Sequence, residues 1–199
     1  MYGLKILVFL LVIGYSYKTP DLKIASAKVE EVSIPDLFIS HNDSEIVVIN
    51  GLLFCNTNAF SGYVIEYFDN GQLKEKMPYF KGKREGKMES FYESGQRNEI
   101  RFFKNNKKSK THQAWWPNGS PRFVYHLENG VFEGNCRDWY DDNSLFKDFN
   151  YKNGKEEGSQ RMWNSDGSLK ANYVMKKGRR FGLIGSKPCY TVKNETIQN

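Results

Sequence analysis

Between residues 60 and 185, short segments rich in aromatic and other apolar side chains alternate with clusters of glycine and asparagine. The apolar positions recur every 24 residues. We call such a set of equivalent positions a slot; one slot holds Tyr67, Phe91, Trp115, Trp139 and Trp163. Short aromatic segments bounded by glycine are typical of β-strands, and glycine at this frequency excludes helices. The pattern therefore predicts an all-β protein built from tandem repeats.

The glycines follow the same 24-residue interval in three series. They are Gly62, Gly86, Gly134, Gly158 and Gly182, with Lys110 in the missing slot; Gly71, Gly95, Gly119 and Gly167, with Asn143; and Gly82, Gly130, Gly154 and Gly178, with Asn106. Asparagine is the residue other than glycine that best tolerates a positive φ, so these are structural turn positions. We expect about five β-hairpins of 24 residues, forming an elongated antiparallel meander sheet.

The first turn of each unit has the composition of a three-residue hairpin loop, as in Asp69-Asn70-Gly71. Such a loop places Tyr67 opposite Leu73, and simple alternation then puts the odd-numbered positions on one apolar face. For Phe91 to share that face, the connection around Gly82 should contain an odd number of residues.

The chain divides into four predicted parts. Residues 1–16 have the basic start and apolar run of a secretory signal, with an uncleaved anchor or a buried strand as the alternatives. Residues 17–45 are a spacer or N-terminal cap, residues 46–185 are the repeat array, and residues 186–199 are a polar tail. Within the array, residues 46–55 are expected to be the second strand of a partial repeat. The protein is therefore expected to be exported.

Charge and cysteine content narrow the choice of partner. The formal net charge is +6, with acidic residues interspersed among the basic ones, which favours a solvated surface over a nucleic-acid site. Of the three cysteines, Cys55, Cys136 and Cys189, at least one stays unpaired if the other two are bridged.

The sequence offers no recognisable catalytic or metal-binding group. His41, His112 and His126 do not form a pattern with a nucleophile. His112 and Cys136 share a slot, but same-slot residues are two strands or about 9–10 Å apart, too far for joint zinc ligation. The pairs Asp141-Asp142 and Glu156-Glu157 are expected to be solvated turn residues. We therefore expect no enzyme activity, no metal and no cofactor.

The candidate partner-binding residues are a ladder of aromatic side chains in one slot. They are Phe68, Tyr92, Trp116 and Tyr140, expected on the face opposite the odd-numbered positions. Exposed aromatic rings are good anchors for a partner. The alternative is that residues 17–45 or the curvature of the sheet cover this face.

Several motifs resemble one known family. Asn153-Gly154-Lys155-Glu156-Glu157-Gly158, Met162-Trp163 and Asp166-Gly167-Ser168-Leu169-Lys170 resemble the bacterial variant of the MORN repeat, found in YwqK-type antitoxins. The resemblance implies an all-β, often exported protein and transfers no catalytic residue. The third unit departs most, at Lys110, Pro121 and Asn105-Asn106.

The leading hypothesis is an exported bacterial binding or scaffold module with a protein partner and no nucleic-acid ligand. Two alternatives stay open: an antitoxin or immunity-like protein that neutralises a toxin, and an envelope protein that binds polysaccharide through Trp115 and Trp116. A membrane surface or a glycan as partner has no supporting motif.

Overall fold

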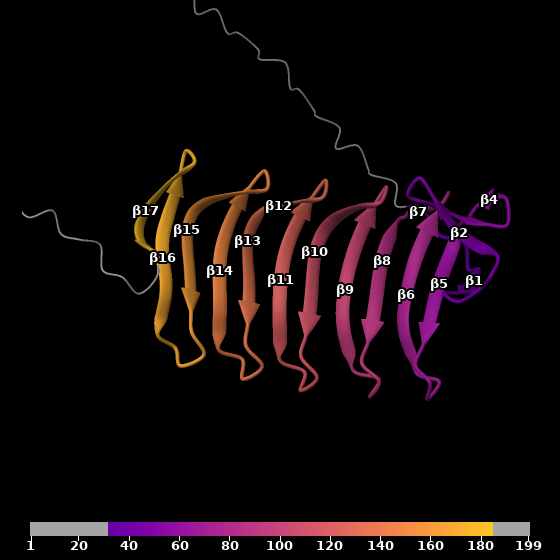
Figure 1. Ribbon diagram of the computed structural model, residues 1–199, viewed down its shortest axis with the longest axis horizontal. Coiled ribbons are helices and arrows are strands. Elements are labelled where there is room, and N and C mark those ends of the chain that lie inside the picture. Colours follow the sequence, from indigo (N-terminus) through magenta and orange to yellow (C-terminus); the bar gives the residue numbers. More distant parts are fainter. Residues whose placement is uncertain (1–31, 185–199) are drawn as a thin grey trace, which may run out of the picture. The chain divides into compact units, whose positions relative to one another are not determined.

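The computed structural model describes residues 32–184, which form two β-sheets (Figure 1). No helix occurs in this part of the chain, and therefore none that could cross a membrane. The strands are β1 (Phe38–Ser40), β2 (Ile46–Ile49), β3 (Leu52–Cys55), β4 (Asn58–Ala59), β5 (Gly62–Tyr67), β6 (Leu73–Phe80), β7 (Lys83–Arg84), β8 (Gly86–Phe91), β9 (Arg97–Lys104), β10 (Lys107–Trp115), β11 (Pro121–Glu128), β12 (Val131–Phe132), β13 (Gly134–Trp139), β14 (Leu145–Lys152), β15 (Lys155–Trp163), β16 (Leu169–Lys176) and β17 (Arg179–Ile184).

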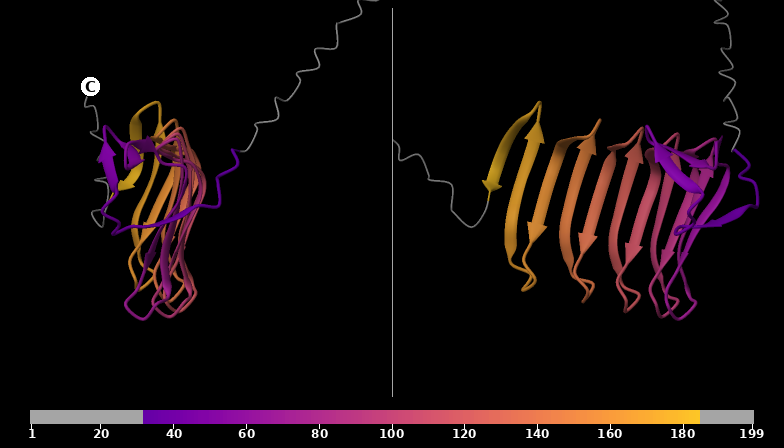
Figure 2. Two further views of the ribbon diagram at one scale, coloured as in Figure 1. Left: turned by 90° about the vertical axis from the view of Figure 1, so that its right-hand side faces the viewer. Right: turned by 45° about the vertical axis from the view of Figure 1, so that its right-hand side comes forward.

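The main sheet is an antiparallel meander from β5 to β17, as the sequence predicts. Consecutive hairpins stack in register, so that all turns of one kind gather at one edge of the sheet and all turns of the other kind at the opposite edge (Figures 1 and 2). The exception to antiparallel pairing is β1, which pairs in parallel with β5 at the N-terminal end.

The three-residue loops are confirmed. In the first unit, the Phe68 amide donates to the Gln72 carbonyl at 2.8 Å, and the Gly71 amide donates to the Phe68 carbonyl at 2.9 Å. Gly71 has a φ of 83°, and Asn143 in the equivalent slot has a φ of 68°. The same pair of hydrogen bonds closes the equivalent loop of every unit, so the turn chemistry read from the sequence is correct.

The prediction of an odd-length connection around Gly82 is wrong. Phe80 pairs directly with Lys83, which leaves a two-residue turn of Lys81 and Gly82 with φ values of 49° and 76°. Positive φ at both central residues defines a type I′ turn, the form whose twist matches that of the flanking strands. The later units repeat this turn, including one made of Asn105 and Asn106.

The predicted odd-numbered apolar face is also wrong, because each hairpin contains a β-bulge beside its loop. Tyr67 does pair with Leu73, but the next pair is Glu66 with Glu75, so Lys74 is an extra residue in the second strand. The bulge shifts the pairing by one position. Even-numbered residues of the first strand therefore share a face with odd-numbered residues of the second, as Val64 does with Met77.

A second irregularity keeps the units in phase after the two-residue turns, except the last one, where β16 and β17 pair without a shift. Phe102 pairs with Ser109, whereas Ile100 pairs with Gln113, so the next unit's first strand contains two extra residues near Lys110. Lys110 adopts a φ of 58° there, in the slot that glycine holds in other units. A shift of two residues preserves the face, so equivalent side chains of successive units point the same way.

One face of the sheet carries the buried side chains, which we call the packed face. Its buried apolar residues from the main sheet are Val64, Met88, Phe103, Ala114, Leu127, Cys136, Phe149 and Tyr173. Rings in equivalent positions of successive units, two strands apart, contact one another there, as Phe149 and Tyr173 do at 6.1 Å between centroids. Because a hairpin alone cannot bury these groups, each unit depends on its neighbours.

Polar groups buried on the packed face complete the backbone pairing that the two-residue shift interrupts. The Gln160 side chain is fully buried; its amide nitrogen donates to the Asn150 carbonyl at 2.8 Å, and its oxygen accepts from the Asn150 amide at 3.1 Å. His112, in the equivalent slot, lies 2.9 Å from the Phe102 carbonyl through Nε2. Since a carbonyl only accepts, that nitrogen carries the hydrogen.

The N-terminal part of the array differs from the prediction. Residues 46–55 form a hairpin, β2 and β3, that turns at Asn50 and Gly51, and β4 completes a separate three-stranded sheet. They are not the second strand of a partial repeat, since Asn-Gly favours a tight turn within the segment. The predicted signal at residues 1–16, most of the spacer and the tail at residues 186–199 lie outside the described residues.

A valine at Gly119 should test the left-handed turn positions. Gly119 has a φ of 85° and no atom within 4 Å of an added Cβ, so Gly119→Val introduces backbone strain without a clash. We expect a loss of about 1–3 kcal/mol in the free energy of unfolding, measured by chemical denaturation. Asn143→Gly, at a φ of 68°, should be neutral or stabilising. The opposite order would contradict the turn assignment.

Stability should fall in mild acid because of His112. Burial lowers the pKa of this imidazole, partly offset by its hydrogen bond to the Phe102 carbonyl. The unfolded chain therefore gains a proton near the ordinary pKa of about 6.5, before the folded chain does. We expect thermal melts to show stability that is full above that pH and is lost as pH falls through it. His112→Met should make stability less dependent on pH in this range. Methionine is chosen because Met88 occupies the equivalent position of the preceding unit.

Candidate functional site

The aromatic ladder lies where the first strand of each hairpin enters its three-residue loop. Phe68 follows β5 directly and continues the even-numbered positions of the packed face. Phe68 and Tyr92 line a hollow together with Met88 and Ser90, two buried residues of that face. The ladder is therefore on the same face as Met77, not on the opposite face as the sequence predicted, because the bulge reverses the parity.

The polar atoms of the ladder tie successive units together. The Tyr92 hydroxyl donates to the Trp115 carbonyl at 2.7 Å, and the Tyr140 hydroxyl donates to the Trp163 carbonyl at 3.1 Å. Trp116 makes the same connection through Nε1 to the Trp139 carbonyl at 3.1 Å. The ladder side chains are half-buried, so what they can offer to a partner is the exposed part of each ring.

The hollow beside the first two ladder residues has a volume of about 320 Å³. Its wall combines aromatic rings, ionisable groups and small polar side chains. The lining residues are Phe68, Lys74, Glu75, Met88, Ser90, Phe91, Tyr92, Asn98, Glu99 and Arg101. Such a mixture of ring surface and a few polar groups is typical of a binding pocket.

Two carboxylates in this wall have different surroundings. Glu99 is buried and forms ion pairs with Arg101, at 2.6 Å, and with Arg122. The Glu75 carboxylate forms no hydrogen bond or ion pair with the described residues; burial and the charge of Glu66 raise its pKa, and the charge of Arg101 opposes this rise. Glu75 is thus a carboxylate in the hollow that no described cation contacts directly.

Trp115 and Trp116 do not form a common surface. Trp115 continues the odd-numbered positions of the first strand and so lies on the face opposite the ladder, with the Arg97 guanidinium 5.9 Å from its ring. Trp116 lies on the packed face, with the Arg122 guanidinium 5.6 Å from its ring. Two adjacent rings on opposite faces cannot stack on the same sugar.

The other residues considered for chemistry have structural contacts. No group of three or more histidine, cysteine or acidic side chains within residues 32–184 is arranged to hold a metal ion. The Cys136 thiol is buried, which raises its pKa, and Cys55 and Cys136 are not bonded to each other. Asp142 accepts hydrogen bonds from Ser144, which lower the pKa of its carboxyl, and Glu156 accepts one from Tyr173.

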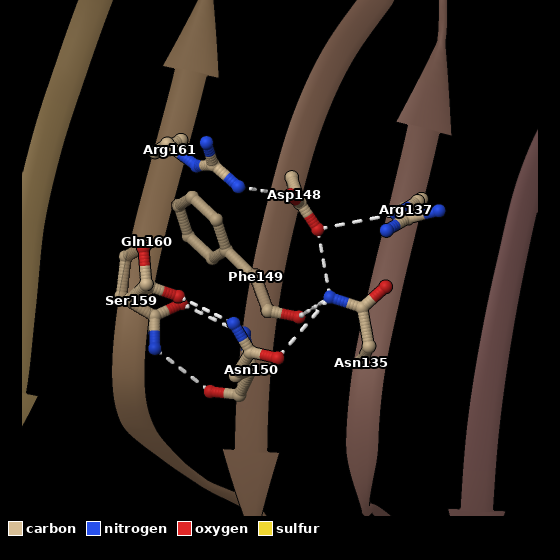
Figure 3. Close-up of polar contacts among 8 residues, drawn as sticks. All are labelled: Asn135, Arg137, Asp148, Phe149, Asn150, Ser159, Gln160 and Arg161. Carbon is tan, nitrogen blue, oxygen red and sulfur yellow. Dashed lines mark hydrogen bonds and ion pairs between the residues drawn. The ribbon is translucent and has the colours of Figure 1, made fainter.

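A polar cluster on the face opposite the packed face was not predicted (Figure 3). Asp148 on β14 is almost fully buried and lies between Arg137 on β13 and Arg161 on β15, at 3.2 and 2.9 Å. Asn135 donates to the same carboxylate at 2.7 Å. The sequence did contain a signal for this cluster. Asp148 is a charged residue at a position of the repeat that holds the apolar residues Val124 and Ile100 in the two preceding units.

These contacts keep the Asp148 carboxylate charged. Desolvation alone would raise its pKa, but the hydrogen bonds from Asn135 and Arg137 and the charges of Arg137 and Arg161 outweigh it, so the pKa is lowered. Its contribution to stability is present above the ordinary pKa of about 3.9 and is lost as pH falls through the lower folded value. The cluster joins three strands of neighbouring units (Figure 3).

Removing this carboxylate should destabilise the fourth and fifth units. Asp148→Ala leaves the Asn135 amide without its carboxylate acceptor, and we expect a loss of about 1–3 kcal/mol in unfolding free energy. Glu66→Gln is the matched control, since the Glu66–Lys74 pair is more exposed and should be worth less than about 1 kcal/mol. Equal losses in chemical denaturation would contradict the structural role of the cluster.

The fold and the repeat chemistry agree with one known family. The profile described as MORN repeat variant matches residues 61–81 and 84–105, which contain Phe68, Glu75 and Tyr92 of the hollow. None of the curated proteins matches the chain. The hairpins of its first two units are thus repeats of the MORN variant type, and the later units continue the same 24-residue pattern.

Proposed function

We propose that this chain is an exported, non-enzymatic repeat module that binds a protein partner at the hollow beside Phe68 and Tyr92. The MORN repeats in the first two units indicate a repeat-based binding module. The single observation that carries the choice of site is Glu75, a half-buried carboxylate without a cation in direct contact, in a hollow walled by aromatic rings.

The wall of the hollow suits a basic side chain of the partner. A lysine or arginine has an apolar stem that can pack on the rings of Phe68 and Tyr92, and a charged tip that can reach Glu75. Cations are attracted both to ring faces and to a carboxylate in a partly desolvated site. Binding would also return the Glu75 carboxyl toward its ordinary pKa.

Contacts of the ionisable groups support a non-enzymatic role. His112 is 3% exposed and its Nε2 is occupied by the Phe102 carbonyl, so it is poorly placed to transfer protons with a ligand. Glu99 in the hollow is neutralised by two arginines. Catalysis by general acids and bases needs such groups within hydrogen-bond reach of a substrate.

Replacing one charge in the hollow should separate binding from folding. We expect Glu75→Gln, which keeps the shape of the side chain, to weaken partner binding at least about tenfold, because a cation loses its counter-charge. The partner would be identified by affinity purification from the source cells with the wild-type chain as bait, and its affinity for the variant measured by calorimetry.

The matched control removes a carboxylate from an exposed loop. Glu93→Gln should leave partner affinity unchanged, since Glu93 belongs to the second three-residue loop and does not line the hollow. Thermal melts of both variants should match the wild type. The proposal would be refuted if Glu75→Gln bound the partner as tightly as the wild type, or if the ligand were a glycan and not a protein. If the partner were a toxin, the protein would be an antitoxin that binds through this hollow.

A further inference from the structure

Two basic segments of the chain, residues 81–84 and 104–110, meet at one edge of the main sheet (Figure 1). The two-residue turns all project from this edge (Figure 1). The first two of these turns and the strand ends beside them carry seven basic residues, which we call the lysine edge: Lys81, Lys83, Arg84, Lys104, Lys107, Lys108 and Lys110. The topology therefore joins two basic segments into one charged patch.

Hydrogen bonds between successive turns hold the lysine edge together. The Asn106 amide donates to the Arg84 carbonyl at 3.0 Å, and the Arg84 amide donates to Asn106 Oδ1 at 2.7 Å. The Gly130 amide donates to the Lys108 carbonyl at 2.8 Å. Because each turn is bonded to the next, the basic side chains project from a fixed backbone rather than from independent loops.

Three lysines of this patch have no acidic partner among the described residues. Lys104, Lys107 and Lys108 form no ion pair with any described residue. Glu85, the acidic residue between the two turns, accepts a hydrogen bond from the Asn105 amide at 2.6 Å. This hydrogen bond fixes the carboxylate but leaves it charged, so the positive potential of the patch comes from the excess of basic residues over Glu85 and Glu128.

Part of the lysine edge is hollowed. A cavity of about 250 Å³ is lined by Lys104, Lys107, Ser109, Lys110, Leu127 and neighbouring residues, among them Lys108 and Glu128. The three lining lysines without an ion pair, Lys104, Lys107 and Lys108, provide up to nine N–H donors. The chemistry of this site calls for carboxylate or phosphate oxygens.

The charge further along the same edge favours a short acidic protein segment. The next turn carries Glu128 and Glu133 and no lysine or arginine, so it would repel a long uniform polyanion lying along the edge. In the turn after it, Lys152 and Lys155 balance Glu156 and Glu157. No aromatic side chain lines the hollow on which a base could stack. Two turns are about 10 Å apart, a span that three or four residues of an extended segment cover.

We propose that the lysine edge is a second binding site, for an acidic segment of a protein partner. It lies at the edge opposite the three-residue loops, and none of its residues lines the ladder hollow. The two sites can therefore be tested separately. A partner that used both would carry a basic side chain for one site and an acidic segment for the other.

Charge reversal on the edge should abolish binding of an acidic probe. The probe is a fluorescein-labelled peptide of about ten glutamates, titrated with the full chain and followed by anisotropy at about 0.05 and 0.2 M salt. We expect Lys104→Glu, Lys107→Glu and Lys108→Glu combined to weaken binding at least about tenfold and to flatten its salt dependence. Thermal melts of this variant should match the wild type, since all three side chains are exposed.

The control makes the same charge change at the last two-residue turn, with Lys176→Glu, Lys177→Glu and Arg179→Glu, and should leave affinity within about twofold. Glu75→Gln should also bind the probe normally, which separates this site from the ladder hollow. Equal loss in the control would overturn the proposal. So would tighter, lysine-dependent binding of single-stranded RNA or of phosphatidylserine vesicles.

Discussion

Every unit of this protein depends on returning the backbone to the same face after 24 residues. Two irregularities act together to do this: a one-residue bulge beside each three-residue loop, and a two-residue shift after the two-residue turns that join the units. The first pairs even with odd positions within a hairpin, and the second preserves that relation between units. Without both, the slots of Val64 and Met77 would not align with those of later units.

The same irregularities explain why polar residues are buried in an aromatic face. A shifted ladder leaves backbone groups without a strand partner, and such groups are costly when buried. Gln160 satisfies both backbone groups of Asn150, and His112 satisfies the Phe102 carbonyl. These side chains, which resemble candidates for chemistry in the sequence, thus complete the secondary structure.

The stacking of hairpins also concentrates surface properties. Residues in equivalent turns are 24 positions apart in the chain but neighbours in space. If successive turns carry the same kind of side chain, these side chains therefore form a continuous patch. The proposed ladder hollow and the proposed lysine edge arise in this way at different places on the same array. A single sheet can thereby offer separate surfaces to one partner or to two.

The sequence by itself determined the all-β class, the 24-residue unit and the three-residue loops, because glycine and asparagine report positive φ locally. It also showed that Phe68 and Tyr92 occupy equivalent positions, since these follow from the 24-residue spacing alone. Only the tertiary structure decided which face these rings occupy, which charges gather, and that Asp148 lies between Arg137 and Arg161. The physical reason is that the face on which a side chain lies depends on how the strands pair. One extra residue, such as Lys74, moves the side chains that follow it to the other face of the sheet. Whether a strand contains such a bulge depends on its pairing with another strand, and the sequence of one strand alone does not determine that pairing.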